Sequence, residues 1–240
     1  MEAGDRKVAL ITGGAKRTGR AIVERLAREG HAVAFTYLSS HDEAAALARA
    51  CGGLAIRTDL TAPEAAVQQV GDALSGFSSR LDVLVHNASL YEAGSLENTD
   101  VGQMRRLMAI HYESPLLLTR LLTPQLRASG GRVVTMVDLL AERPWPQYLA
   151  YCASKAALAN LTLGLARELA PDVTVNGIAP GVVAWPDDYP ESERAKYLKR
   201  VPLRRAGTPE DVAELVHFLC TAGSYLTGQI LRLDGGRSIT

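Results

Sequence analysis

Short apolar runs alternate with longer amphipathic segments from one end of the chain to the other. Most of these runs are continuously apolar and rich in β-branched residues, which is typical of strands in a sheet that is covered on both faces. The predicted strands are Val8–Ile11, Ala32–Phe35, Leu54–Ile56, Val83–Val85, Val133–Val137, Val173–Val175 and Ile230–Leu233. Strands that alternate with helices pair in parallel through right-handed crossovers.

Helical spacing fills the intervals between the strands. In residues 20–29, Ile22 and Leu26 lie four positions apart on one side, whereas Glu24 lies on the other. Further helices are expected to begin at Pro63, after a cap at Thr61 or Ala62, to cover Leu116–Leu126 and Ala153–Leu169, and to begin again at Pro209. The pattern predicts an α/β fold, a single doubly wound Rossmann-type domain over residues 1–240 with a seven-stranded parallel sheet and helices on both faces.

The least regular stretch is Gly181–Pro190, which carries Trp185, Pro186 and the pair Asp187 and Asp188. We interpret it as a long loop over the carboxyl ends of the strands, where open α/β sheets bind their ligands.

Composition narrows the classes of function. The 240 residues carry 26 Lys and Arg against 26 Asp and Glu, so the formal net charge is zero. That balance argues against binding to nucleic acid or to an anionic membrane. The three cysteines lie far apart along the chain, which argues against a disulfide framework or a structural zinc. We expect no metal site. The polar start Met1–Lys7 and the lack of a long uncharged apolar run predict a cytoplasmic protein without a membrane span.

A glycine-rich segment, Thr12–Gly19, lies between the first predicted strand and the first predicted helix. Glycines such as Gly13 and Gly19 at this place let the backbone turn tightly, so that a pyrophosphate can sit on the helix N-terminus. The strict GxGxxG spacing is absent, so a glycine-rich turn that binds nothing also fits the segment.

The end of the second strand bears on the type of cofactor. NAD sites usually have an acidic residue there to bind the ribose hydroxyls. Here Ser39 and Ser40 occupy the region and no acid occurs before Asp42, while Lys16 and Arg17 lie in the glycine-rich segment. This combination favours NADP(H), with its additional phosphate. The alternative is that the two cations are simply exposed to solvent.

The pair Tyr151 and Lys155 has helical spacing, so the phenol and the ammonium share one helix face. A nearby ammonium is expected to lower the pKa of the tyrosine and to make it a proton donor usable near neutral pH. An ordinary surface pair would have the same spacing. A second polar cluster, Asn87, Ala88 and Ser89, follows the fourth strand at the predicted ligand edge, where an Asx-type turn is the alternative.

These motifs, in this order, resemble the short-chain dehydrogenase/reductase superfamily over nearly the whole chain. Asp59-Leu60 matches its adenine-contacting dipeptide, Asn176–Gly181 its nicotinamide-side loop, and Thr227–Gln229 with Asp234–Gly236 its last strand. The resemblance implies a nicotinamide cofactor. Its expected contacts are Gly13, Lys16, Arg17, Gly19, Ser39, Ser40, Asp59, Leu60, Asn87, Ala88, Lys155, Pro180 and Gly181.

The departures from the superfamily pattern point to one branch of it. Arg17 and Ser89 stand where glycines are usual, and Asp138 stands thirteen residues before Tyr151, where the catalytic serine is usual. With Tyr91 two residues after Ser89, these features resemble pteridine reductases and dihydromonapterin reductases. Dihydromonapterin-type enzymes also share His111 in place of the usual asparagine. The basic residue that many pteridine reductases have after the second strand is missing, since Ser39 and Ser40 stand there.

The resemblance implies NADPH-dependent reduction of a pterin, with Asp138, Tyr151 and Lys155 as catalytic residues. A carboxyl group can pair with the amide and amine edge of a pterin and can relay a proton. The expected substrate contacts are Arg17, Ser89, Tyr91, Asp138, Tyr151 and Trp185. Other roles remain open, because Asp138 can cap a turn, Tyr91 can pack on the core, and Arg17 can serve the cofactor alone.

Two other functions are compatible with the sequence. A carbonyl reductase for a ketone or an acyl thioester needs Tyr151, Lys155 and a protonated Asp138, because an ionised carboxylate would repel the developing oxyanion. A non-catalytic NADP(H) sensor is the remote alternative, since the proton-transfer pair is present. The resemblance also implies a homotetramer with a pterin-like small molecule as its ligand.

Overall fold

The seven predicted strands form one parallel sheet. The computed structural model describes residues 6–185 and 189–240, so Pro186, Asp187 and Asp188 of the expected loop lie outside the described residues. The sheet order is β3-β2-β1-β4-β5-β6-β7. The strands are β1 (Val8–Ile11), β2 (Ala32–Tyr37), β3 (Leu54–Arg57), β4 (Val83–His86), β5 (Arg132–Met136), β6 (Thr174–Pro180) and β7 (Ile230–Leu233). The doubly wound α/β prediction is confirmed.

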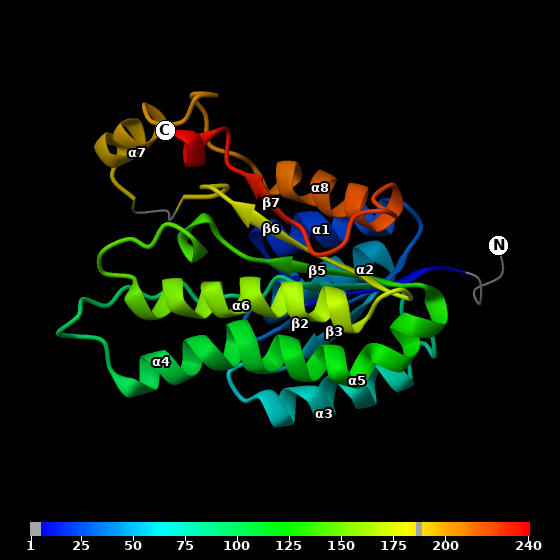
Figure 1. Cartoon of the computed structure of the whole chain (residues 1–240). Coiled ribbons are helices and arrows are strands. Elements are labelled where there is room, and N and C mark those ends of the chain that lie inside the picture. The colour runs from blue at the N-terminus through cyan, green and yellow to red at the C-terminus, as the bar shows by residue number, and fades with distance from the viewer. Residues whose placement is uncertain (1–5, 186–188) are drawn as a thin grey trace.

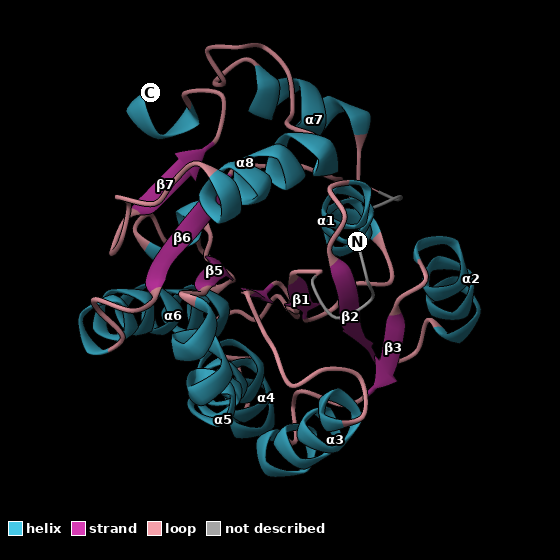
Figure 2. Ribbon diagram, turned by 90° about the vertical axis from the view of Figure 1, so that its right-hand side faces the viewer, coloured by secondary structure: helices cyan, strands magenta, loops and turns pink. Residues whose placement is uncertain are grey.

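Helices cover both faces of the sheet (Figures 1 and 2). One layer contains α1 (Arg17–Arg28), α2 (His41–Cys51) and α8 (Pro209–Thr221), and the other contains α3 (Pro63–Ser75), α5 (Ser114–Ser129) and α6 (Leu149–Glu168). Along β1, Val8 and Leu10 enter one core while Ala9 and Ile11 enter the other. This alternation of side chains explains why a strand buried on both faces is apolar at every position.

Several short elements were not expected from the sequence. They are α2, α4 (Val101–Met108), the π-helical segment Ala109–Glu113 that joins α4 to α5, the 3-10 turns Leu139–Ala141 and Arg237–Ile239, and α7 (Glu191–Leu198). Helix α7 buries none of its residues, so it leaves no apolar stripe to detect. It lies beside the C-terminus at the edge of the molecule (Figure 1).

Helix α6 is long and apolar enough to span a membrane by length and composition alone. In the structure it packs on the sheet, and Leu158, Leu161 and Leu165 belong to the core below it. It also carries the buried Lys155. Core helices of compact domains satisfy the same criteria, and the packing assigns α6 to that group.

The order of the strands determines where the polar groups meet. β1 pairs with β2 on one side and with β4 on the other, so the chain reverses its direction of winding at β1. In open α/β sheets, ligands bind outside the carboxyl ends of the strands at such a point. Loops that follow β1, β4, β5 and β6 therefore converge there.

Replacing Thr208 with alanine is expected to destabilise the fold by about 1 kcal/mol, because it removes one half of a capping box. The Thr208 hydroxyl accepts from the Asp211 N–H at 3.2 Å, and the Asp211 carboxylate accepts from the Thr208 N–H at 2.9 Å. Urea unfolding of Thr208→Ala measures the effect. Thr221→Ala, at the other end of α8, is the control and should change the stability by less than about 0.5 kcal/mol. Equal stability of the two variants would contradict the prediction.

Candidate active site

The glycine-rich segment packs tightly against the residues that follow β4. A Cβ on Gly13, whose φ is +65°, would lie 2.9 Å from the Ala88 Cα. A Cβ on Gly19 would lie 2.0 Å from the Gly13 carbonyl oxygen. The Asn87 amide donates to the carbonyl oxygens of Thr12 and Gly13, both at 3.0 Å. Asn87 and Ala88, predicted as cofactor contacts, thus shape the loop that would receive the pyrophosphate.

The N-terminus of α1 is suited to an anion. It has no acidic residue in its first turn, and its N-cap, Lys16, makes no side-chain capping bond. The N–H groups of this turn carry partial positive charge, and Lys16 and Arg17 add two cations beside them. The residues present therefore fit the phosphates of a dinucleotide.

The two cations of this segment have different partners. Lys16 forms an ion pair of 2.7 Å with Glu43 on α2, and both side chains are exposed. Arg17 reaches across to the loop after β6, where its guanidinium donates to the Ala184 carbonyl oxygen at 3.1 Å. Arg17 also adopts a φ of +50°, the left-handed region that favours glycine. This backbone conformation accounts for the glycine that the superfamily has at the same place.

The remaining predicted cofactor residues lie along the same edge of the sheet. Ser39 is exposed and Ser40 is the N-cap of α2, without a side-chain capping bond. Asp59 accepts from the N–H and the hydroxyl of Thr61, at 2.8 and 2.7 Å, while Leu60 is buried. Pro180 ends β6, and the Gly181 N–H donates to the Leu233 carbonyl oxygen at 3.0 Å. Their roles toward the cofactor remain predictions.

The three predicted catalytic residues meet at the end of β5. The Tyr151 hydroxyl donates to Asp138 Oδ2 at 2.7 Å, and Asp138 Oδ1 accepts from the Leu140 N–H at 2.8 Å. The carboxyl group therefore caps the turn Leu139–Ala141 and contacts the phenol at the same time. The Lys155 ammonium donates to the Met136 carbonyl oxygen at 2.8 Å and lies 5.8 Å from the centre of the Tyr151 ring.

The expectation of a lowered tyrosine pKa is wrong for this arrangement. Burial raises the pKa of Tyr151 well above its usual value, and the neighbouring Asp138 raises it further. Burial also raises the pKa of Asp138, against the opposing effects of the Leu140 N–H, the Tyr151 hydroxyl and Lys155. Burial lowers the pKa of Lys155 to about 8. The prediction from the Tyr151–Lys155 spacing did not include desolvation, which disfavours the charged form of every one of these groups.

His111 connects two serines beside these groups. It is fully buried in the π-helical segment, with Nδ1 2.8 Å from Ser154 Oγ and Nε2 2.8 Å from Ser89 Oγ. Burial holds the pKa of His111 far below its usual value, so the ring is neutral. Ser89 also lowers the pKa of Tyr151, against the larger effect of burial. The importance of Ser154 could not be read from the sequence, because it lies among many small residues of α6.

Aromatic side chains gather beside the catalytic residues. Tyr91 stacks on Tyr148 with ring centres 4.7 Å apart and meets the edge of Tyr151 at 4.8 Å. Trp185 packs against Tyr189 at 4.9 Å and against Tyr197 at 5.4 Å. Both tryptophans and five of the eight tyrosines take part in this group, which we call the aromatic slot: Tyr91, Trp145, Tyr148, Tyr151, Trp185, Tyr189 and Tyr197. Only Tyr91, Tyr151 and Trp185 were predicted.

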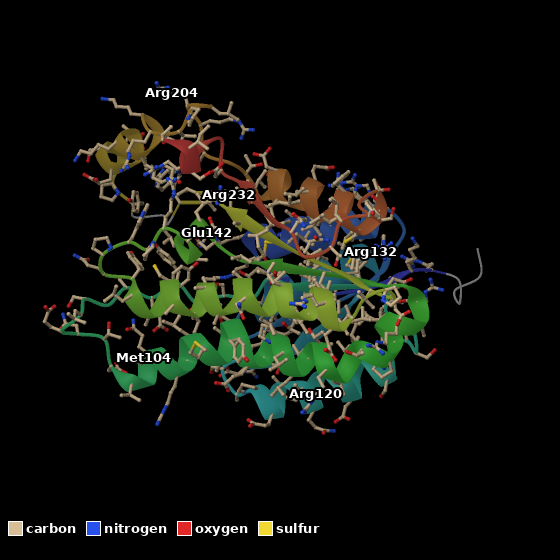
Figure 3. The ribbon with its side chains drawn as sticks, in the orientation of Figure 1. Met104, Arg120, Arg132, Glu142, Arg204 and Arg232 are labelled. Atoms are coloured by element: carbon tan, nitrogen blue, oxygen red, sulfur yellow. The ribbon has the colours of Figure 1, made fainter. Side chains whose placement is uncertain are left out.

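An ion pair ties the Asp138 segment to the last strand. Glu142, which follows the turn Leu139–Ala141, pairs with Arg232 of β7, and Figure 3 labels both. Within residues 6–185 and 189–240, no group of three or more His, Cys, Asp or Glu side chains is arranged to hold a metal ion.

Comparison with known proteins identifies the family of this chain. A family model described as enoyl-(acyl carrier protein) reductase matches residues 13–238. Dihydromonapterin reductase of Enterobacter sp. (strain 638) is 30% identical over 233 residues, which cover 96% of each chain. Pteridine reductase 1 of Leishmania tarentolae is 31% identical, over 97% of this chain and 96% of its own. The chloroplastic NADPH-dependent aldehyde reductase 1 of Arabidopsis thaliana is 34% identical, over 96% of this chain and 85% of its own.

Solved structures give the same assignment. A short-chain dehydrogenase/reductase from Serratia marcescens is 36% identical with a TM-score of 0.89, covering 97% of this chain and 98% of its own. A short chain dehydrogenase from Burkholderia cenocepacia, in complex with NADP, is 32% identical with a TM-score of 0.89, covering 97% of each chain. The chain therefore belongs to the short-chain dehydrogenase/reductase family and is an oxidoreductase with a nicotinamide-cofactor site.

The strain at Arg17 can be measured by comparing two variants. Arg17→Gly and Arg17→Ala both remove the contact with the Ala184 carbonyl, but only glycine adopts the left-handed conformation without strain. Arg17→Gly should therefore be more stable than Arg17→Ala by about 1 kcal/mol in urea unfolding. Both variants should bind the cofactor more weakly than the wild type. If the alanine variant were the more stable one, the backbone at this position would not be strained.

Proposed function

We propose that this chain is an NADPH-dependent reductase of a pterin, acting on a C=N bond of a dihydropterin. The observation that carries the proposal is the 2.7 Å hydrogen bond between the Asp138 carboxyl and the Tyr151 hydroxyl, at the floor of the aromatic slot. Had Asp138 turned into solvent, away from the phenol, only a general oxidoreductase would be supported. Its position beside Tyr151 supports a specific role in proton delivery.

The cofactor, when bound, supplies a hydride to the substrate carbon. The α1 N-terminus and Arg17 would hold its phosphates, and Lys155, with its ammonium at the end of β5, would hold the nicotinamide ribose. NADPH is favoured over NADH because Lys16 lies next to α2, near Ser39 and Ser40, with no carboxylate at the end of β2. The Burkholderia relative in complex with NADP is consistent with this preference.

Asp138 and Tyr151 would provide the proton that the substrate nitrogen takes up. When the pair holds two protons, one lies between the two oxygens and the other can be donated from the Tyr151 hydroxyl into the slot. The raised pKa of Asp138, caused by burial, favours this doubly protonated state. A serine in place of Asp138 would supply a hydrogen bond but no comparable store of a second proton.

The aromatic slot would bind the flat ring of the substrate. Tyr91, with half of its surface exposed at 51%, offers an accessible ring face already braced by Tyr148. A second ring, that of Trp185 in the loop after β6, is supported by Tyr189 and Tyr197. Stacking between rings of this kind favours planar heterocycles over aliphatic ketones. Arg17, Ser89, Tyr91, Asp138, Tyr151 and Trp185 form the proposed substrate contacts.

A carbonyl reductase is the second candidate. It requires Asp138 to be protonated, and the upward shift of its pKa by burial meets that requirement in part. The similarity to an aldehyde reductase of Arabidopsis thaliana also supports it. Asp138→Ser separates the two candidates. A carbonyl reductase should keep or gain activity with serine, whereas a pterin reductase should lose it.

The direct test supplies NADPH with dihydrobiopterin or dihydromonapterin and follows the nicotinamide absorbance. We expect turnover of at least one of them, with a rate that falls as the pH rises through the pKa of Asp138, because the second proton is then lost. Asp138→Asn should lower kcat by about a hundredfold or more and remove that pH dependence. Brisk reduction of a simple ketone, with no turnover of either pterin, would refute the proposal.

The coenzyme preference can be tested through the Lys16–Glu43 ion pair. Glu43→Gln leaves Lys16 fully available to a phosphate, so the KM for NADPH should fall a few-fold. Lys16→Ala should raise the KM for NADPH about fivefold, the size expected of an exposed charge contact. The KM for NADH serves as the internal control and should be unaffected by either change. Parallel shifts for both coenzymes would show that Lys16 does not distinguish them.

A further inference from the structure

The hydrogen bonds around His111 determine where its protons lie. Ser154 Oγ is 2.7 Å from the Tyr151 carbonyl oxygen, which can only accept, so the single hydroxyl proton of Ser154 is donated there. Ser154 then has no proton left for His111 Nδ1, 2.8 Å away. Nδ1 must therefore carry the hydrogen itself and donate it to Ser154.

The consequence passes through the ring to Ser89. Because the buried ring is neutral, a hydrogen on Nδ1 leaves Nε2 as an acceptor. Ser89 Oγ lies 2.8 Å from Nε2 and must donate its only hydroxyl proton to it. The other possible acceptor of that proton, the Leu90 carbonyl oxygen, is farther away at 3.4 Å. Ser89 is left with lone pairs alone to present to the site.

The neighbouring phenol adds to this constraint. When Asp138 is ionised, Tyr151 directs its own proton to Asp138 at 2.7 Å, so that Ser89 and Tyr151 both present oxygen lone pairs to the site. When the pair of Asp138 and Tyr151 holds two protons, Tyr151 presents a proton and Ser89 remains the acceptor. A group that fits there without leaving lone pairs unsatisfied must bring a hydrogen-bond donor.

We propose that His111, held in one tautomer by Ser154, makes Ser89 an obligate hydrogen-bond acceptor and so selects substrates that carry an N–H or amino group beside the reacting bond. His111 and Ser154 are positioning residues, since they act through Ser89. The inference rests on the proposed function and deepens it, because a pterin has such donors on its edge whereas a simple aldehyde or ketone has none. A buried acceptor discriminates strongly against a ligand that cannot satisfy it.

The local backbone favours this arrangement. His111 lies in the middle of the π-helical segment Ala109–Glu113, between α4 and α5. π-Helical turns are rare and often lie at functional sites, because the additional residue turns a side chain out of the ordinary helical register. Here the turn brings the ring edge-on to Tyr151, with centres 5.6 Å apart, between Ser89 on one side and Ser154 on the other.

The tautomer can be observed without turnover. Protein labelled with ¹⁵N-histidine gives two-bond ¹H–¹⁵N correlations that identify the protonated ring nitrogen, and loss of one of the five histidine patterns in His111→Asn assigns the residue. We expect His111 to be neutral and protonated on Nδ1 at neutral pH. A hydrogen on Nε2, or a charged ring, would overturn the proposal even if the enzyme reduced pterins.

The selection can be measured with dihydrobiopterin and with 4-nitrobenzaldehyde, which carries no hydrogen-bond donor. Ser89→Ala should raise the KM for dihydrobiopterin about tenfold, which corresponds to the loss of one hydrogen bond, and should change its kcat little. The KM for the aldehyde should fall, because the acceptor that the aldehyde leaves unsatisfied is no longer present. Ser154→Ala should also raise the KM for dihydrobiopterin, because His111 is then free to adopt the other tautomer and to turn the Ser89 hydroxyl around.

Two further variants separate this role from a structural one. Ser129→Ala also removes a hydroxyl that donates to a backbone carbonyl, at the far end of α5, and should leave the ratio of the two KM values unchanged. The double variant Ser89→Ala with Ser154→Ala should have a KM for dihydrobiopterin no higher than that of Ser89→Ala alone, since both act through one contact.

Equal effects on both substrates, additive effects, or an unchanged ratio in Ser154→Ala would overturn the proposal. Failure of the wild type to reduce any pterin would instead refute the proposed function, and the tautomer measurement would still stand on its own.

Discussion

The hydrogen bond between the Asp138 carboxyl and the Tyr151 hydroxyl is the contact on which the chemistry of this molecule depends. Its two partners come from different segments, the turn that follows β5 and the first turn of α6. Burying either group in its charged form would cost free energy unless the groups around it compensated the charge. The Leu140 N–H and the Met136 carbonyl supply fixed backbone partners to Asp138 and Lys155, so the site is oriented by the main chain of the sheet edge.

Desolvation sets the protonation states of the whole cluster. It raises the pKa of the acids Asp138 and Tyr151, lowers the pKa of Lys155 and keeps His111 neutral. The residual attraction between the Lys155 ammonium and the Asp138 carboxylate opposes both of their shifts. A site of this kind stores protons on neutral groups, which suits a reaction in which a nitrogen atom gains one.

Much of the architecture was predictable because the sheet is buried on both faces. The seven apolar runs found in the sequence all became strands, since no position of a strand such as β1 faces water. Helix α7 was missed because it buries no residue, and α2 buries only Ala44 and Leu47. Local periodicity carries no signal when a helix has so little of its surface in the core.

The site was predictable only in part. Tyr151 and Lys155 were found from their helical spacing and Asp138 through the resemblance, and the structure brings the three together. Tyr148 and Tyr197 were not found, because their contacts with Tyr91 and Trp185 join segments that are distant along the chain. The direction of the Tyr151 pKa shift was wrong for the same reason: spacing along one helix says nothing about the carboxyl group and the burial that surround it.

Because of the π-helical turn at Ala109–Glu113, the number of residues in this part of the chain determines where the His111 ring lies. Each residue of an α-helix rotates the next side chain by about 100°. Deleting one residue between Val101 and Ser114 would restore ordinary helical pitch and swing the imidazole away from both serines, while α5 would keep its packing. An insertion or deletion here would therefore change the hydrogen bonds of the site while the fold would be little disturbed.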